Sequence, residues 1–125
     1  MGANNDFFYK MFSEEIDNSW IDFSRLPANS YQGLIATADL DVGFSKAEDL
    51  RQYNVLAADW DSGAFAHICN INDIPCTIVR GVSDVPKSDS PEDIERQHTE
   101  FIKNTPIIME ILLKKVLPAL LLLLD

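Results

Sequence analysis

Acidic residues follow three short apolar runs in this chain of 125 residues. Asp39 comes directly after "GLIATA", Asp61 after "NVLAADW", and Asp84 after "CTIVRGVS". A carboxyl group that is partly buried near other acids can hold a proton near neutral pH and act as a general acid. The two oxygens of an ionised carboxylate can instead accept from the two hydroxyls of a sugar diol. These acids therefore indicate a site for a polar ligand, provided that the apolar runs are strands ending at one edge.

Each of these residues also has a simpler interpretation. Asp84 could merely cap a turn, Asp61 could stabilise the start of the helix that follows it, and Trp60 could belong to the core. Arg80 lies inside an apolar run, so a buried guanidinium there would need an acidic partner, and Asp59 and Asp61 are the candidates. The residue types alone leave both interpretations open.

Short apolar runs alternate with helical patterns along the chain, which predicts an α/β fold. We expect strands at 33–38, 54–60 and 76–82. Such strands favour a largely parallel sheet with helices on both faces. Because the carboxyl ends of parallel strands meet at one edge, the acids would lie together there, where ligands bind in sheets of this kind.

Helices are expected at 5–18, 45–53, 62–73 and 90–116. Ser45 and Ser90 are candidate N-caps of the second and the last of these helices. Gly63 and the small residues after it would let the third helix lie close to the sheet. Pro106 and Pro118 should kink or break the last helix, and the charged run "PEDIER" at its start should face solvent.

Composition narrows the possible partners. The formal charge of −10 disfavours binding to nucleic acid. The chain has no secretory signal at its start, and its leucine-rich tail is too short to span a bilayer, so we expect no membrane association and a cytoplasmic location.

Cysteine and histidine usage predicts no metal site. Cys69 and Cys76 are expected to be reduced core residues. With His67 and His98 they give no metal-ligand spacing, so no metal and no other cofactor is expected.

Three motifs together carry a resemblance to a known family. "GLIATAD", "AADWDSGAFAHIC" and "IPCTIVRGVSD" resemble, in this order, the C-terminal half of the nucleoside phosphorylase/nucleosidase superfamily. Within it they are most similar to the 5′-methylthioadenosine/S-adenosylhomocysteine nucleosidases, over about residues 33–117. The resemblance implies a three-layer α/β/α sheet, apparently incomplete at the N-terminus. Residues 33–125 would form this half-domain, preceded by an N-terminal helix and loop over 1–32.

The resemblance also implies roles for individual residues. Asp84 matches the family's purine-facing aspartate, which protonates or hydrogen-bonds N7 of the leaving base, and Ser83 would support it. Asp61 matches a glutamate that holds the ribose hydroxyls. Trp60 matches a methionine that packs against the sugar.

The resemblance also implies two residues around the base, Asp41 and Val42. Asp41 and Val42 fall where the family places an aromatic and an aliphatic residue. Residues 1–32 do not resemble the glycine-rich half that carries the family's nucleophile site.

The function that the resemblance implies is cleavage of the N-glycosidic bond of methylthioadenosine- or S-adenosylhomocysteine-type nucleosides, as an N-ribosyl hydrolase. One alternative is a catalytically incomplete module that binds nucleosides or a protein partner, and another is a purine nucleoside phosphorylase. The expected ligand is a purine nucleoside. An open sheet edge favours a homodimer or a separate partner chain.

Overall fold

A small parallel sheet lies at the centre of the molecule. The computed structural model describes residues 14–124, and the structural statements below concern those residues. Strand β1 (Leu34–Thr37) pairs in parallel with β2 (Val55–Asp59), with Thr37 opposite Asp59. The two strands confirm the expected ones at 33–38 and 54–60. Their parallel pairing with an intervening helix confirms the α/β class, whereas the three-layer sheet stays a prediction.

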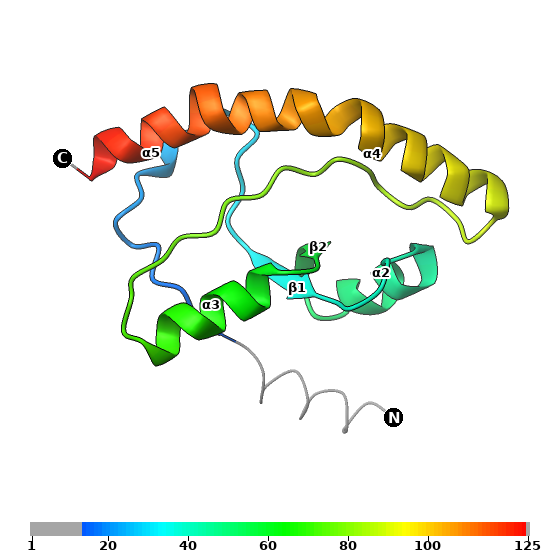
Figure 1. Cartoon of the computed structure of the whole chain (residues 1–125), viewed down its shortest axis with the longest axis horizontal. Coiled ribbons are helices and arrows are strands. Elements are labelled where there is room, and N and C mark those ends of the chain that lie inside the picture. The colour runs from blue at the N-terminus through cyan, green and yellow to red at the C-terminus, as the bar shows by residue number, and fades with distance from the viewer. Residues whose placement is uncertain (1–13, 125) are drawn as a thin grey trace.

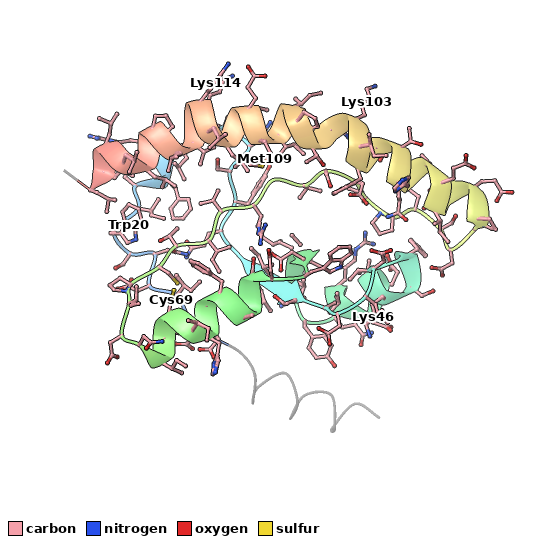
Figure 2. All side chains as sticks on the ribbon, viewed as in Figure 1. Trp20, Lys46, Cys69, Lys103, Met109 and Lys114 are labelled. Atoms are coloured by element: carbon pink, nitrogen blue, oxygen red, sulfur yellow. The ribbon has the colours of Figure 1, made fainter. Side chains whose placement is uncertain are left out.

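Helices make up most of the rest of the molecule (Figure 1). They are the 3₁₀ turn η1 (Phe23–Arg25) and the helices α2 (Phe44–Arg51), α3 (Ser62–Ile71), α4 (Pro91–Ile111) and α5 (Leu117–Leu123), with the π turn η2 (Leu112–Val116) joining the last two. Figure 1 shows α4 and α5 as one long helical segment along one side of the molecule. Lys103 and Lys114 point away from the molecule on its outer side (Figure 2).

The prediction of a third strand at 76–82 is wrong, because this segment is an extended loop. Figure 1 shows it running between α4 and the sheet. Side chains hold it there: Arg80 reaches the end of β2, and a Cβ at Gly81 would collide with Ile108 of α4. An apolar run becomes a strand only where a neighbouring strand offers its free backbone groups. The sequence pattern gives the apolarity but not the neighbour.

Helix α3 packs closely on β1, as its small residues predict. A Cβ at Gly63 would lie 2.9 Å from the Thr37 hydroxyl, and the Gly63 amide already donates to that oxygen over 2.7 Å. Ala66 and Cys69 of the same helix are buried. Ile71, the last residue of the helix, and Ile74 after it are more than half exposed.

Of the two predicted N-caps, one is confirmed, that of α4, and the other, that of α2, is wrong. The Ser90 hydroxyl accepts from the Asp93 amide, which confirms the N-cap of α4. Ser45 is not a cap, because α2 begins one residue earlier and Gly43 precedes it. Asp89, from the loop before α4, instead accepts from the Ser45 amide at 3.2 Å. A distant carboxylate thus takes the place of the local cap.

Two prolines lie inside the C-terminal helical segment without ending it at the expected positions. Helix α4 continues through Pro106, and Pro118 is the second residue of α5. The Thr105 hydroxyl donates to the Phe101 carbonyl at 2.5 Å beside Pro106. The wide turn η2 comes between the two prolines.

The charged start of α4 is not wholly solvated as predicted. Asp93 of "PEDIER" is buried and accepts from the amides of Lys87 and Ser88 at 2.9 and 3.0 Å. The helix expected at 5–18 lies mostly outside the described residues, and its last part, 14–18, is not helical. No described helix combines the length and apolarity that crossing a bilayer needs.

Candidate functional site

Asp59, the last residue of β2, is the centre of a polar network. Its carboxylate accepts from the Thr37 hydroxyl and the Ser62 amide, each at 3.1 Å, and from the Ser62 hydroxyl. Arg80 Nε lies 2.9 Å from its Oδ2. The residue therefore ties together both strands, the start of α3 and the loop that follows α3.

Arg80 bridges two carboxylates. Besides Asp59 it forms an ion pair with Asp61, and its Nε donates to the Ser62 hydroxyl at 3.1 Å. The acidic partners expected for Arg80 are thus both confirmed. We call Asp59, Asp61, Ser62 and Arg80 the β2-end cluster. Within it the side chain of Asp59 is 15% exposed and that of Asp61 is 75% exposed, so of the two carboxylates Asp61 is the one open to a ligand.

The charge state of Asp59 follows from these contacts. Burial raises the pKa of Asp59, but hydrogen bonds from Ser62, the positive charge of Arg80 and the Thr37 hydroxyl together outweigh it. The net effect holds the pKa of this carboxyl below its usual range. Asp59 is therefore a fixed anion that positions Arg80 rather than a group that exchanges a proton near neutral pH.

A cavity opens beside the β2-end cluster. Its volume is about 300 Å³, and its lining combines polar and apolar side chains: Asp61, Ser62, Phe65, Thr77, Ile78, Val79 and Arg80. This volume is at the lower end of the range of about 300 to 1,000 Å³ for small-molecule sites. One aromatic ring and an exposed carboxylate with its guanidinium partner are groups that a polar ring-containing ligand could contact.

A larger and more apolar cavity, of about 880 Å³, lies between the 76–82 loop and the C-terminal helices. Its lining includes Ile35 and Leu56 of the sheet and Ile108 and Val116 of the helical segment. Arg80 of the β2-end cluster lines this cavity as well, so the two cavities share that side chain.

Asp84 belongs to a second polar group. The Ser83 hydroxyl donates to its Oδ1 at 2.6 Å, and Gln97 of α4 donates to its Oδ2 at 3.4 Å. Asn104, two turns further along α4, donates to the Ser83 carbonyl at 2.8 Å. We call Ser83, Asp84, Gln97 and Asn104 the Asp84 cluster. It fixes the end of the loop on α4, as the β2-end cluster fixes its middle on the sheet.

The other predicted site residues lie at the same end of the sheet as Asp61. Trp60 follows β2 and is 67% exposed, so the alternative that it belongs to the core is wrong. Asp41 is exposed and Val42 is half-buried on the loop that leaves the carboxyl end of β1. Ser83 and Asp84 lie further along the chain in the Asp84 cluster. The ligand-contacting roles of all six residues remain predictions.

Sequence reasoning missed several supporting residues. Ser62, Gln97 and Asn104 were not identified, although one signal was present: the last two are seven residues apart and share a helix face. Among residues 14–124, no three His, Cys, Asp or Glu side chains are grouped so that they could hold a metal ion.

Comparisons with known proteins agree with the resemblance that the three motifs carry. A sequence profile described as the Phosphorylase superfamily matches residues 6–118. The chain is also similar to a protein of Treponema pallidum (strain Nichols) named 5′-methylthioadenosine/S-adenosylhomocysteine nucleosidase, with 28% identity over 72 residues. This alignment covers 56% of the chain and 26% of the relative, so it spans about a quarter of that protein. No solved structure matches the chain at a significant level.

Proposed function

Because this chain belongs to the Phosphorylase superfamily, we propose that it binds purine nucleosides of the methylthioadenosine or S-adenosylhomocysteine type and cleaves their N-glycosidic bond. The observation that carries the proposal is the meeting of two motifs beside a cavity. Arg80 of "IPCTIVRGVSD" pairs with Asp61 of "AADWDSGAFAHIC", and both line the 300 Å³ cavity. Asp84 follows Arg80 by four residues on the same loop.

Asp61 would bind the ribose. Its carboxylate is exposed, and its ion pair with Arg80 orients it. Two carboxylate oxygens can accept from the two ribose hydroxyls. As the glycosidic bond breaks, the sugar gains positive charge, and a carboxylate on the sugar side stabilises that charge.

Asp84 would act on the leaving base. Protonation of purine N7, or a strong hydrogen bond to it, lets the base depart without a negative charge. The Ser83 hydroxyl and the Gln97 amide hold the two oxygens of Asp84 in place through neutral contacts. Trp60, Asp41 and Val42 would contact the sugar and the base from the carboxyl ends of the strands.

A second candidate function is a nucleoside-binding or interaction module without turnover. The observation that favours it is the open edge of the small sheet. In the described residues each strand has one neighbour, so each also has an open edge. Such an edge favours a homodimer or a partner chain. A third candidate, purine nucleoside phosphorylase, differs only in using phosphate in place of water.

Base release tests these candidates. Purified chain would be incubated with methylthioadenosine, S-adenosylhomocysteine, adenosine and inosine, with and without phosphate, and free base measured by chromatography. Asp84→Asn removes the proton donor with little change in shape. Asp49→Asn, on the exposed face of α2, is the matched control.

The outcomes separate the three candidates. Release that Asp84→Asn abolishes and Asp49→Asn retains supports the nucleosidase. Release that requires phosphate supports the phosphorylase. Nucleoside binding by calorimetry without release, in protein shown to be folded, supports the binding module. A folded chain that neither binds nor cleaves any of the four nucleosides overturns the proposal.

A further inference from the structure

The larger cavity, of about 880 Å³, is bounded by four parts of the chain. Its walls come from the segment before β1, from the sheet, from the 76–82 loop and from the C-terminal helical segment. The volume lies near the upper end of the range of about 300 to 1,000 Å³ for small-molecule sites. A ligand held there would contact all four parts at once.

Several large apolar side chains of this cavity are left uncovered by the fold. Leu56, which lies on β2, is 58% exposed. Four other lining residues of this kind are also exposed: Phe23, Val79, Val82 and Ile111. Each methylene group that is removed from water favours binding by about fourfold. An apolar ligand would therefore gain affinity from every part of its length that covers these side chains.

The charge of the lining is opposite to that of the chain. The sequence has 20 acidic and 10 basic residues, yet none of the described residues that line this cavity is acidic and two of them, Arg80 and Lys115, are basic. Arg80 is occupied by Asp59 and Asp61. Within residues 14–124, Lys115 forms no ion pair. Lys115 therefore provides the positive charge that is available to an anionic group of a ligand.

We propose that this cavity binds one fatty acid, with its unbranched hydrocarbon chain against the apolar walls and its carboxylate at Lys115. Lys115 belongs to η2 and is exposed. The carboxylate would thus stay in contact with water at the mouth of the cavity, which avoids the cost of burying an unpaired charge. A neutral apolar ligand would leave the charge of Lys115 unused.

Fatty-acid binding does not depend on the proposed nucleoside cleavage. Asp61 and Phe65 line only the smaller cavity, although residues 77–80 form a wall of both. Uptake of the acid and release of the base are separate measurements on the same protein. Either one can fail while the other succeeds.

Calorimetry on the full chain tests the proposal. Decanoate, dodecanoate and tetradecanoate would each be titrated below their micelle concentrations. We expect one acid to bind per chain. The affinity should increase about tenfold for each pair of added methylene groups, because these groups leave water for the apolar walls.

Two neighbouring lysines test the position of the carboxylate. Lys115→Met keeps the bulk of the side chain and removes its charge. It should weaken decanoate binding about two- to fivefold, as for an exposed ion pair, and leave the binding of 1-decanol unchanged. Lys114→Met is the matched control, since Lys114 pairs with Glu110 at 2.8 Å and points away from the molecule (Figure 2). It should bind both ligands as the parent protein does.

Two neighbouring alanines of β2 test the position of the hydrocarbon chain. Successive side chains of a strand point to opposite faces, and Ala57 lines the cavity whereas Ala58 does not. Ala57→Leu should weaken tetradecanoate binding about tenfold, because its added carbons take the space of chain methylenes. Ala58→Leu should leave the affinity unchanged. Circular dichroism would check the folding of both variants.

Several results would overturn the proposal. Uptake of many acids per chain without saturation would mean adsorption on exposed apolar surface. Equal affinities for the three acids, or equal losses in Lys114→Met and Lys115→Met, would exclude the proposed position of the ligand. A folded chain that sediments as a dimer and binds no decanoate would mean that a second copy covers the cavity.

Discussion

The β2-end cluster and the Asp84 cluster hold the middle and the end of one loop by different means. In the first, a guanidinium lies between two carboxylates, of which Asp59 is largely buried. In the second, a hydroxyl and two amides hold Ser83 and Asp84 through neutral hydrogen bonds. Charge fixes the loop on the sheet, whereas the contacts of the Asp84 cluster with α4 are neutral.

This difference suits the two roles that we propose. The guanidinium of Arg80 holds Asp61, the proposed acceptor for the ribose hydroxyls, through an ion pair. Asp84 has a hydroxyl and an amide as its hydrogen-bond partners, and both donate to its carboxyl oxygens. The loop therefore brings Arg80 to Asp61 and presents Asp84 itself, and a nucleoside that contacts both acids would span both clusters.

The largest expected effect comes from removing the charge that defines the β2-end cluster. Arg80→Ala leaves the largely buried Asp59 without its cation and breaks the bond to Ser62. We expect the free energy of unfolding to decrease by about 2 kcal/mol, less than for a fully buried pair because Arg80 is partly exposed. Urea unfolding followed by fluorescence measures this change.

Matched variants show which carboxylate accounts for the loss. Arg51→Ala removes an exposed ion pair with Glu48 on α2 and should cost less than about 0.5 kcal/mol. In double-mutant cycles, Arg80 should couple more strongly to Asp59 than to the exposed Asp61. Equal losses for Arg51→Ala and Arg80→Ala would contradict the importance of this cluster for stability.

Breaking the Asp84 cluster should lower the free energy of unfolding by less than breaking the β2-end cluster. Asn104→Ala removes the hydrogen bond to the half-buried Ser83 carbonyl, which we expect to cost about 1 kcal/mol in unfolding free energy. Thr99→Ala, on the exposed face of the same helix, is the control, since its hydroxyl bonds only within α4. A loss in Asn104→Ala as large as that in Arg80→Ala would remove the distinction between charged and neutral anchoring.

The sequence predicts the parts of this arrangement that depend on local pattern. Strands β1 and β2 and the cap of α4 by Ser90 follow from apolar runs and capping residues close in the chain. The pairing of Arg80 with acids was predictable because a guanidinium among apolar residues needs a counter-charge. That argument required no knowledge of the fold.

The missed features depend on distant contacts instead. The 76–82 segment has the pattern of a strand, but a strand also requires a partner that its own sequence does not contain. Asp89 caps α2 from 44 residues away, and Asn104 reaches Ser83 from 21 residues away. A polar side chain in a helix has many possible partners, so its sequence position alone does not identify the one that it finds.

Acid stability tests the α4 side of the loop separately. The amides of Lys87 and Ser88 and the charge of Arg96 lower the pKa of Asp93 to about 2, against a cost of burial. Because the folded value is below the ordinary 3.8, ionised Asp93 stabilises the fold fully above about pH 4. This contribution decreases as the pH falls from about 4 to about 2.

Asp93→Asn should therefore flatten the dependence of unfolding free energy on pH between these two values. Urea unfolding at several pH values measures the slope in both proteins. An unchanged slope in the variant would mean that other carboxyl groups account for the acid sensitivity, and that the start of α4 does not depend on the charge of Asp93.

The smallest effect on stability is expected for Trp60, which lies between Asp59 and Asp61 in the sequence. Because its side chain is 67% exposed, Trp60→Ala should change the free energy of unfolding by less than about 0.5 kcal/mol. A loss near 2 kcal/mol would mean that the ring packs within the fold. If the proposed nucleoside site is correct, methylthioadenosine should quench the fluorescence of the parent protein but not that of Trp60→Phe. If Trp60 affects nucleoside binding but not stability, the ligand lies at the β2-end cluster. The Asp84 cluster contains no aromatic ring on which a base could stack.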